Sequence, residues 1–178
     1  MQCSAAGLQL LKRSEGFRGR VYRDVAGVPT IGYGHRLRRG ESFPNGIEKA
    51  QALEILASDV REAERTVEHL VKVPLTQGQF DALTDFVFNL GSGRLAASTL
   101  LSKLNESNYK EAVDQLLRWD HAGSSESAAL KARRESEAAL WLKDSARDQA
   151  VASLSQENPG SRAEAVEEQK QLTNQQNA

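Results

Sequence analysis

The 178-residue sequence contains one cysteine, Cys3, and no long apolar run. A single cysteine excludes an internal disulfide and a metal cluster held by several thiolates. No stretch approaches the roughly 18 consecutive apolar residues that a membrane-spanning helix needs. The first residues also lack the basic segment and apolar core of a signal peptide, so we expect the protein to accumulate in the cytoplasm.

Aromatic residues and prolines are scarce, at 6% aromatic residues and four prolines. The apolar fraction is 39%, which is modest but compatible with one domain that has its own core. No group of His, Cys and Asp residues has zinc-ligand spacing. We therefore expect neither a metal nor a cofactor.

Charge is distributed unevenly along the chain, although the net charge is only −1. Residues 1–40 hold eight Lys or Arg but only two acids, Glu15 and Asp24. Such a basic segment attracts polyanions, among them nucleic acid, anionic lipid and bacterial wall polymers, or it is simply a solvated loop. No interleaved aromatic and basic residues support nucleic-acid binding, so we expect none.

The order of the secondary-structure signals predicts an α+β fold. A short helix over residues 1–14, with Ser4 as its N-cap, precedes Gly-rich, β-prone pieces over 16–39 that predict a small antiparallel sheet. Apolar residues at three- and four-residue steps predict a long helix over about 47–71. Further helices are predicted over 76–90, 95–105, 109–119 and 128–143, with a loop at 120–127.

These elements predict a small N-terminal lobe over about 1–46, a linking helix over about 47–71 and a mostly helical C-terminal lobe over about 72–144. Residues 145–178 are rich in Ser, Gln, Glu and Asn and contain few large apolar side chains. Such a segment buries too little apolar surface to offset its ordering cost, so we expect a polar tail, disordered or helical. Two stretches of it can become helical against a surface: 146–154 and 162–172.

Two carboxylates and a hydroxyl lie close together in the Gly-rich stretch: Glu15, Asp24 and Thr30. Acid-assisted cleavage of a sugar–sugar bond needs a group that protonates the leaving oxygen and, in inverting enzymes, a base that activates water. Glu15 would be the acid, Asp24 the base or electrostatic stabiliser, and Thr30 would share the attacking water. Taken singly, each residue is more simply a helix-end, turn or strand residue.

The complete run is more specific than its parts. Glu15-x8-Asp24-x5-Thr30, followed by Ile-Gly-Tyr-Gly-His, resembles the catalytic segment of phage-type lysozymes, glycoside hydrolase family 24. Three downstream stretches resemble the family in the same order: 79–91, 98–105 and 118–141. The resemblance covers about residues 5–143 and excludes the tail.

This resemblance implies a lysozyme-like enzyme with its active cleft between the two lobes. By the same resemblance Glu15 donates the proton, and Asp24 and Thr30 position and activate water. The substrate would be the β-1,4 bond between N-acetylmuramic acid and N-acetylglucosamine in bacterial peptidoglycan. Inversion would place the two carboxyls about 6.5–9.5 Å apart. We also expect a monomer that reaches the wall, in the periplasm of the host, through a holin-type membrane opening.

Other residues have less specific roles. His35 is a tempting second base, but the resemblance pairs it with Asp59 and so implies a structural contact. The candidate sugar-contacting residues are Tyr33, Phe88, Asn89 and Thr99, because aromatic faces pack on sugar rings and polar groups bind their substituents. For Phe88 a place in the core is an equal alternative.

Other functions remain open at this point. A lytic transglycosylase forms an anhydro-sugar and uses no water, and the presence of both Asp24 and Thr30 argues against it. A wall-binding domain without catalysis is the alternative from another class. Lys131, Arg133 and Arg134 would give the last predicted helix a basic, solvated face, which could touch anionic peptide stems or disturb a membrane.

Overall fold

The computed structural model describes residues 1–24, 26–123 and 125–157. Residues Met1–Lys143 form one compact unit, and Asp144–Ala178 form a second. None of the helices in the described ranges combines the length and hydrophobicity needed to cross a lipid bilayer.

The chain begins with α1 (Ala5–Glu15), which carries Glu15 at its last position. The Ser4 hydroxyl accepts hydrogen bonds from the backbone N–H groups of Ala6 and Gly7, so Ser4 is the N-cap that the sequence predicts. The helix ends at Gly16, whose φ of +67° suits a residue without a Cβ. The cap and the glycine together set the two ends of α1 and thereby place Glu15 in its last position.

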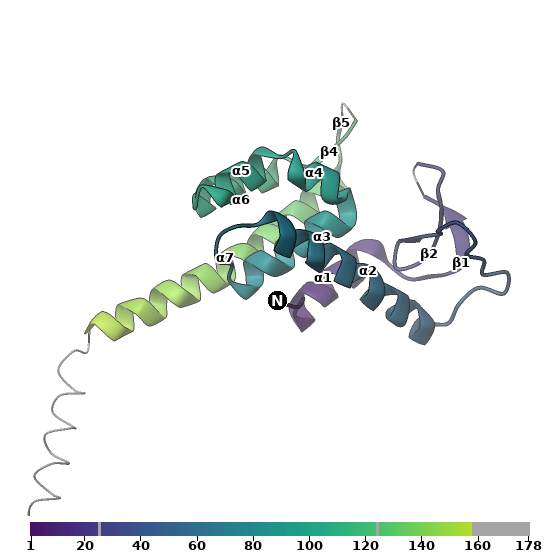
Figure 1. Ribbon diagram of the computed structural model, residues 1–178, viewed down its shortest axis with the longest axis horizontal. Coiled ribbons are helices and arrows are strands. Elements are labelled where there is room, and N and C mark those ends of the chain that lie inside the picture. The colour runs from purple at the N-terminus through teal and green to yellow at the C-terminus, as the bar shows by residue number, and fades with distance from the viewer. Residues whose placement is uncertain (25, 124, 158–178) are drawn as a thin grey trace, which may run out of the picture. The chain divides into compact units, whose positions relative to one another are not determined.

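A three-stranded antiparallel sheet follows, as the sequence predicts (Figure 1). Its strands lie in the order β1 (Arg18–Arg23), β2 (Pro29–Gly32) and β3 (His35–Arg36). Tyr22 faces Thr30 across the first pair, and Ile31 faces His35 across the second. Pro29 is the first residue of β2, a position where its missing N–H does not interrupt the ladder.

The long helix α2 (Lys49–Leu70) contributes to two hydrophobic cores. Its N-terminal part, up to Val60, supplies Leu56 and Val60 to the core that also contains Ile31 of β2. Its second half supplies Ala63 and Val67 to the larger helical core. A single helix therefore buries apolar side chains in both hydrophobic cores.

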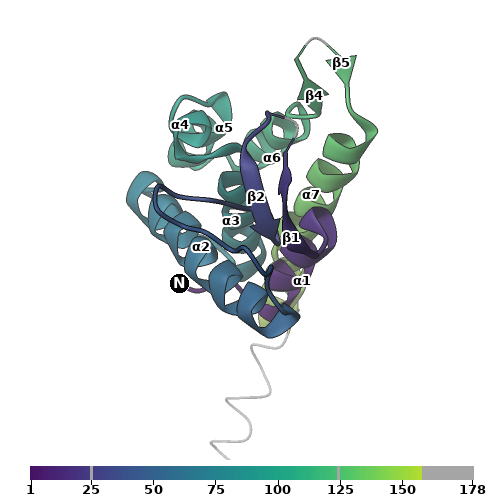
Figure 2. The ribbon, with the colours of Figure 1, turned by 90° about the vertical axis from the view of Figure 1, so that its right-hand side faces the viewer.

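At the centre of the helical lobe lies α3 (Gln77–Leu90), with α2 on one side and α1 on the other (Figure 2). Thr76 and Gln79 form the predicted capping box at its start. Ten consecutive residues from Gly78 to Val87 are buried, which agrees with an apolar surface around most of the helix. The remaining elements are α4 (Ser92–Ala96), α5 (Thr99–Asn105), α6 (Tyr109–Leu117), β4 (His121–Ala122), β5 (Ser125–Glu126) and α7 (Ala128–Glu157).

The structure corrects three boundaries. The helix predicted over 95–105 is two helices, because Ser98 turns out of the helix and caps α5 by accepting from Leu101 N. The loop predicted at 120–127 contains the β4–β5 pair. The last helix does not stop at 143 but continues through 146–154, whereas the predicted helix over 162–172 lies outside the described residues.

Candidate active site

Glu15 is held from two sides. Arg133, from α7, donates from Nη1 to Glu15 Oε1 at 2.6 Å. The other carboxyl oxygen lies against Gly34, where an added Cβ would be only 2.7 Å from Glu15 Oε2. The Glu15 side chain is 19% exposed. A carboxyl that is fixed in direction and still reaches solvent is suited to deliver a proton to a bound molecule.

Arg133 and Arg134 are buried, at 7% and 0% exposure, and the prediction of a solvated basic face was wrong. Arg133 forms ion pairs with Glu15 and with Asp85 of α3, while Arg134 forms one with Glu137. Only Lys131 of the three basic residues is exposed. The membrane-disturbing alternative therefore loses the basic face on which it depended.

A sequence signal for this burial exists. Trp141 is 1% exposed, and Glu137, Arg134 and Arg133 precede it by four, seven and eight residues. These spacings place the four side chains on one helical face. The charged residues that share a face with a buried tryptophan were candidates for a buried ion-pair cluster.

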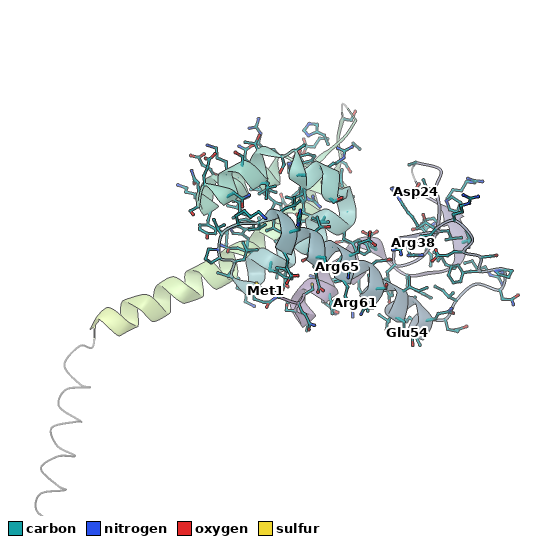
Figure 3. The ribbon with its side chains drawn as sticks, viewed as in Figure 1. Met1, Asp24, Arg38, Glu54, Arg61 and Arg65 are labelled. Carbon is teal, nitrogen blue, oxygen red and sulfur yellow. The ribbon has the colours of Figure 1, made fainter. Side chains whose placement is uncertain are left out.

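Asp24 stabilises the turn that joins β1 and β2 (Figure 3). Its Oδ1 accepts hydrogen bonds from the backbone N–H groups of Ala26 and Val28, at 2.9 Å each, and Oδ2 accepts one from Arg36 Nε at 2.9 Å. The Val28 hydrogen bond, followed by those from Ala26 and Arg36, lowers the pKa of Asp24 against the opposing effect of burial. Asp24 is therefore ionised at neutral pH, as a base or electrostatic stabiliser must be.

Thr30 lies on the same hairpin, at the second position of β2, and is 2% exposed. Its hydroxyl donates to the carbonyl oxygen of Val28 at 3.0 Å. Val28 thus bonds to both predicted water-activating residues, through its N–H to Asp24 and through its C=O to Thr30. The hairpin brings these two residues together, as the sequence suggests.

The predicted contact between His35 and Asp59 is present, with 2.7 Å between Nδ1 and Oδ2. The sequence did not reveal a second partner, Glu41, whose Oε2 lies 2.9 Å from His35 Nε2. Burial alone would lower the pKa of His35, but the hydrogen bonds to Glu41 and Asp59 outweigh it and raise the pKa above its ordinary value. With both ring nitrogens occupied by carboxylates, His35 has the contacts of a structural residue.

Replacing His35 with Ala is expected to lower the free energy of unfolding by about 2 kcal/mol near pH 5.5 while turnover remains measurable. The contribution of His35 is fully present below its unfolded-state pKa of about 6.5 and is lost as the pH rises through the raised folded-state pKa. The Arg38 N–H, followed by His35, lowers the pKa of Glu41, so acid removes the contribution only as the pH falls through that lowered value. Denaturant unfolding across this pH range measures the effect.

His69 provides the matched control, because it is an exposed histidine in the last turn of α2. Replacing His69 with Ala should change stability little at any pH. If a folded His35→Ala protein has no activity, His35 takes part in catalysis and the structural interpretation is wrong.

Two of the predicted sugar-contacting residues lie in positions compatible with that role. Phe88 lines a cavity of about 330 Å³ together with Gly34 and His35, and it also packs against both cores. Asn89 lines a second cavity, of about 510 Å³, beside Glu15. Phe88 therefore combines the two alternatives, core and cavity wall, that the sequence left open.

The other two are less favourably placed. Tyr33 is 7% exposed, belongs to the core of the N-terminal lobe and packs on Phe17 with 5.6 Å between ring centroids. Thr99 is exposed at the first position of α5. In the part of the chain that the structure describes, no group of three or more His, Cys, Asp and Glu is arranged to hold a metal ion.

Replacing Gly34 with Ala is expected to reduce turnover by about 100-fold, because the new Cβ would displace the Glu15 carboxyl. The residue has φ of +80°, so backbone strain accompanies the collision. Gly40→Ala is the control: its φ is +90°, and no heavy atom of the described residues lies within 4 Å of an added Cβ. Initial rates on peptidoglycan should fall for the first variant only. Equal rates would mean that the Gly34 contact does not position Glu15.

Comparison with known proteins gives the family. The family model described as phage lysozyme matches residues 12–137. The chain is similar to the endolysin of Salmonella phage P22, at 42% identity over 145 residues that cover 80% of this chain and 99% of the relative. It is also similar to the SAR-endolysin of Escherichia phage Mu, at 39% identity over 125 residues that cover 67% of this chain and 69% of the relative.

The solved structures agree. A crystal structure of a P22 lysozyme variant matches with a TM-score of 0.70 at 40% identity and covers 80% of this chain and 99% of its own. This match confirms the predicted α+β lysozyme-like fold, with its N-terminal antiparallel sheet and mostly helical remainder. The chain therefore belongs to the phage lysozyme family, glycoside hydrolase family 24, and the protein is an endolysin-type lysozyme that degrades peptidoglycan.

Proposed function

We propose that this lysozyme hydrolyses the β-1,4 bond between N-acetylmuramic acid and N-acetylglucosamine with inversion, using Glu15 as acid and Asp24 with Thr30 as the water-activating pair. The main support is the environment of Glu15, whose carboxyl is fixed by Arg133 and by the close approach of Gly34. The environment of Asp24 adds to it, because three hydrogen bonds keep that carboxylate ionised. The two acids thus have the different environments that their different roles require.

In the first half of the reaction, protonated Glu15 gives its proton to the glycosidic oxygen as the bond to the muramic acid carbon breaks. The sugar then has oxocarbenium character, and the leaving sugar departs as an alcohol. Glu15 becomes a carboxylate in this step, and the positive charge of Arg133, 2.6 Å away, stabilises it. Solvent returns the proton after the products leave.

In the second half, water attacks the same carbon from the opposite face. Asp24 accepts the proton that the water loses and passes it to solvent after the reaction; if Asp24 only stabilises the positive charge on the sugar, the water loses this proton directly to solvent. The Thr30 hydroxyl uses its hydrogen to donate to Val28 O, so the Thr30 oxygen keeps lone pairs with which to accept a hydrogen bond from the water. Inversion follows because attack and departure occur on opposite faces.

The mass of the fragments tests this proposal against the transglycosylase alternative. Purified peptidoglycan treated with the enzyme should release fragments that have each gained one water. Fragments that end in an anhydro-sugar would instead show that the muramic acid hydroxyl, rather than water, attacks. A protein that clears no wall material but sediments with it would be a binding module.

Several finer points stay predictions: the monomeric state, the sugar contacts of Tyr33, Phe88, Asn89 and Thr99, and entry to the wall through a holin-type opening. The similar proteins include both endolysins and SAR-endolysins. The comparisons therefore do not fix the release route. Expression in a host with and without a holin gene tests the route. We expect lysis only when the holin is present.

A further inference from the structure

A cluster of buried charged side chains surrounds the contact between Arg133 and Glu15, and its other members, Asp85, Arg134 and Glu137, take no part in the reaction steps above. It joins three helices, with Glu15 from α1, Asp85 from α3, and Arg133, Arg134 and Glu137 from α7. Asp85, Arg134 and Glu137 are 0% exposed, and Arg133 is 7% exposed. Burying so many charges is costly unless each is paired, so their mutual arrangement needs an explanation.

Arg133 uses all three of its guanidinium nitrogens. Nε donates to Asp85 Oδ2 at 2.7 Å, and Nη2 donates to Asp85 Oδ1 at 3.1 Å. Nη1 donates to Glu15 Oε1 at 2.6 Å. Because the guanidinium is planar and rigid, the two bonds to Asp85 fix its plane and thereby the direction of the third donor.

Two further charged residues of α7, Glu137 and Arg134, lie beside Asp85 and Arg133 in the cluster. Burial, followed by the neighbouring Asp85 carboxyl group, raises the pKa of Glu137 well above its usual range. Arg134 lies between Glu137 Oε1, at 2.7 Å, and Asn89 Oδ1, at 3.0 Å, and contributes a second positive charge.

From this arrangement we propose that Asp85 is a positioning residue of the enzyme: its carboxylate holds Arg133 by two hydrogen bonds and so sets the direction and the net charge that Arg133 presents to Glu15. Asp85 touches neither substrate nor water in this scheme and acts only through Arg133. The inference rests on the proposed role of Glu15 as the acid. Tyr22 of β1 is a further titratable group near Glu15: burial raises the pKa of Tyr22, and the charge of Glu15 adds to this effect.

The test is the pH dependence of turnover of Asp85→Asn on soluble, uncross-linked peptidoglycan strands at fixed ionic strength. We expect kcat to fall by at least about 10-fold, with KM within about twofold, because binding groups are untouched. The alkaline limb of the rate profile should move to lower pH by about one unit, since the charge of Arg133 is no longer offset by Asp85. A wild-type profile in the folded variant would overturn the proposal.

Asp81→Asn is the matched control, because Asp81 is another buried aspartate of α3, 1% exposed, that instead bonds to Ser4. It should lower stability but leave the pH profile unchanged. Arg133→Lys keeps the charge but cannot bridge both carboxylates. If Asp85 acts through Arg133, adding Asp85→Asn to Arg133→Lys should cost less than about twofold in kcat. Additive losses would contradict that mechanism.

A measurement on the wild-type protein does not depend on whether Asp85→Asn folds. The Nε–H bond of Arg133 should have an NMR order parameter near 0.85, typical of a rigid group, and a value below about 0.6 would overturn the proposal. Glu15→Gln in the same rate assay separates the two proposals. Full activity of that variant means that the proposed function fails. A dead Glu15→Gln beside a wild-type Asp85→Asn profile means that only this inference fails.

Discussion

Replacing Glu15 with Gln is expected to reduce the turnover of peptidoglycan by at least about 1,000-fold, because the amide keeps the shape of the carboxyl but has no proton to give. The fold should survive, since Gln can still accept the hydrogen bond from Arg133 through its carbonyl oxygen. Turbidity loss of purified wall gives the rate, and circular dichroism with thermal unfolding shows that the variant is folded.

Glu54→Gln is the control for this experiment. Glu54 is an exposed residue of α2, away from the Glu15 contacts, and is labelled in Figure 3. Its variant should match the wild-type rate. If a folded Glu15→Gln protein keeps more than about a tenth of wild-type activity, Glu15 is not the general acid.

The second large effect is expected for Asp24→Asn, which should lower kcat by about 100-fold or more. The Asn side-chain oxygen can still accept the hydrogen bonds from Ala26 and Val28 that shape the turn, so the substitution removes the negative charge and the pairing with Arg36. In the wild type the lowered pKa of Asp24 keeps it ionised, and activity should persist into mildly acidic solution. Initial rates across pH measure both effects.

Glu62→Gln is a comparison for the loss of an arginine partner. Glu62 pairs with Arg38 at 2.9 Å much as Asp24 pairs with Arg36 at 2.8 Å, but it lies on α2 and not on the hairpin. Its replacement should change kcat by less than about twofold, because exposed ion pairs contribute little. If Asp24→Asn and Glu62→Gln lose equal amounts of kcat, the basic surface, and not a water-activating carboxylate, sets the rate.

The sequence predicts the fold well because its signals are local. The period of apolar residues places α2 and α3, the capping box at Thr76 starts α3, and the Gly-rich pieces predict the sheet. The candidate site could be predicted from the sequence because Glu15, Asp24 and Thr30 lie within one short run, and their catalytic roles stay predictions. Val28 contacts both of the last two residues, because its N–H donates to Asp24 and its C=O accepts from Thr30.

The buried cluster was not predicted because its partners are distant in the chain. Arg133 is 118 residues from Glu15 and 48 residues from Asp85, so the shared helical face with Trp141 can suggest that Arg133 is buried but cannot identify its partners. Charged side chains on a helix are usually solvated, and only tertiary partners make their burial favourable. The end of α7 was missed for a related reason: polar residues with good helix propensity can continue a helix beyond the part that is anchored by Trp141.

The most direct test of the account is the fate of the oxygen atom and the configuration of the new reducing end. Soluble peptidoglycan strands would be cleaved in water labelled with oxygen-18 and followed by mass spectrometry and proton NMR from the first turnovers. We predict one labelled oxygen on the muramic acid carbon and initial formation of the α-anomer, as attack opposite the departing group requires. An anhydro-sugar without label, or a β-anomer formed first, would contradict the proposed roles of Glu15, Asp24 and Thr30.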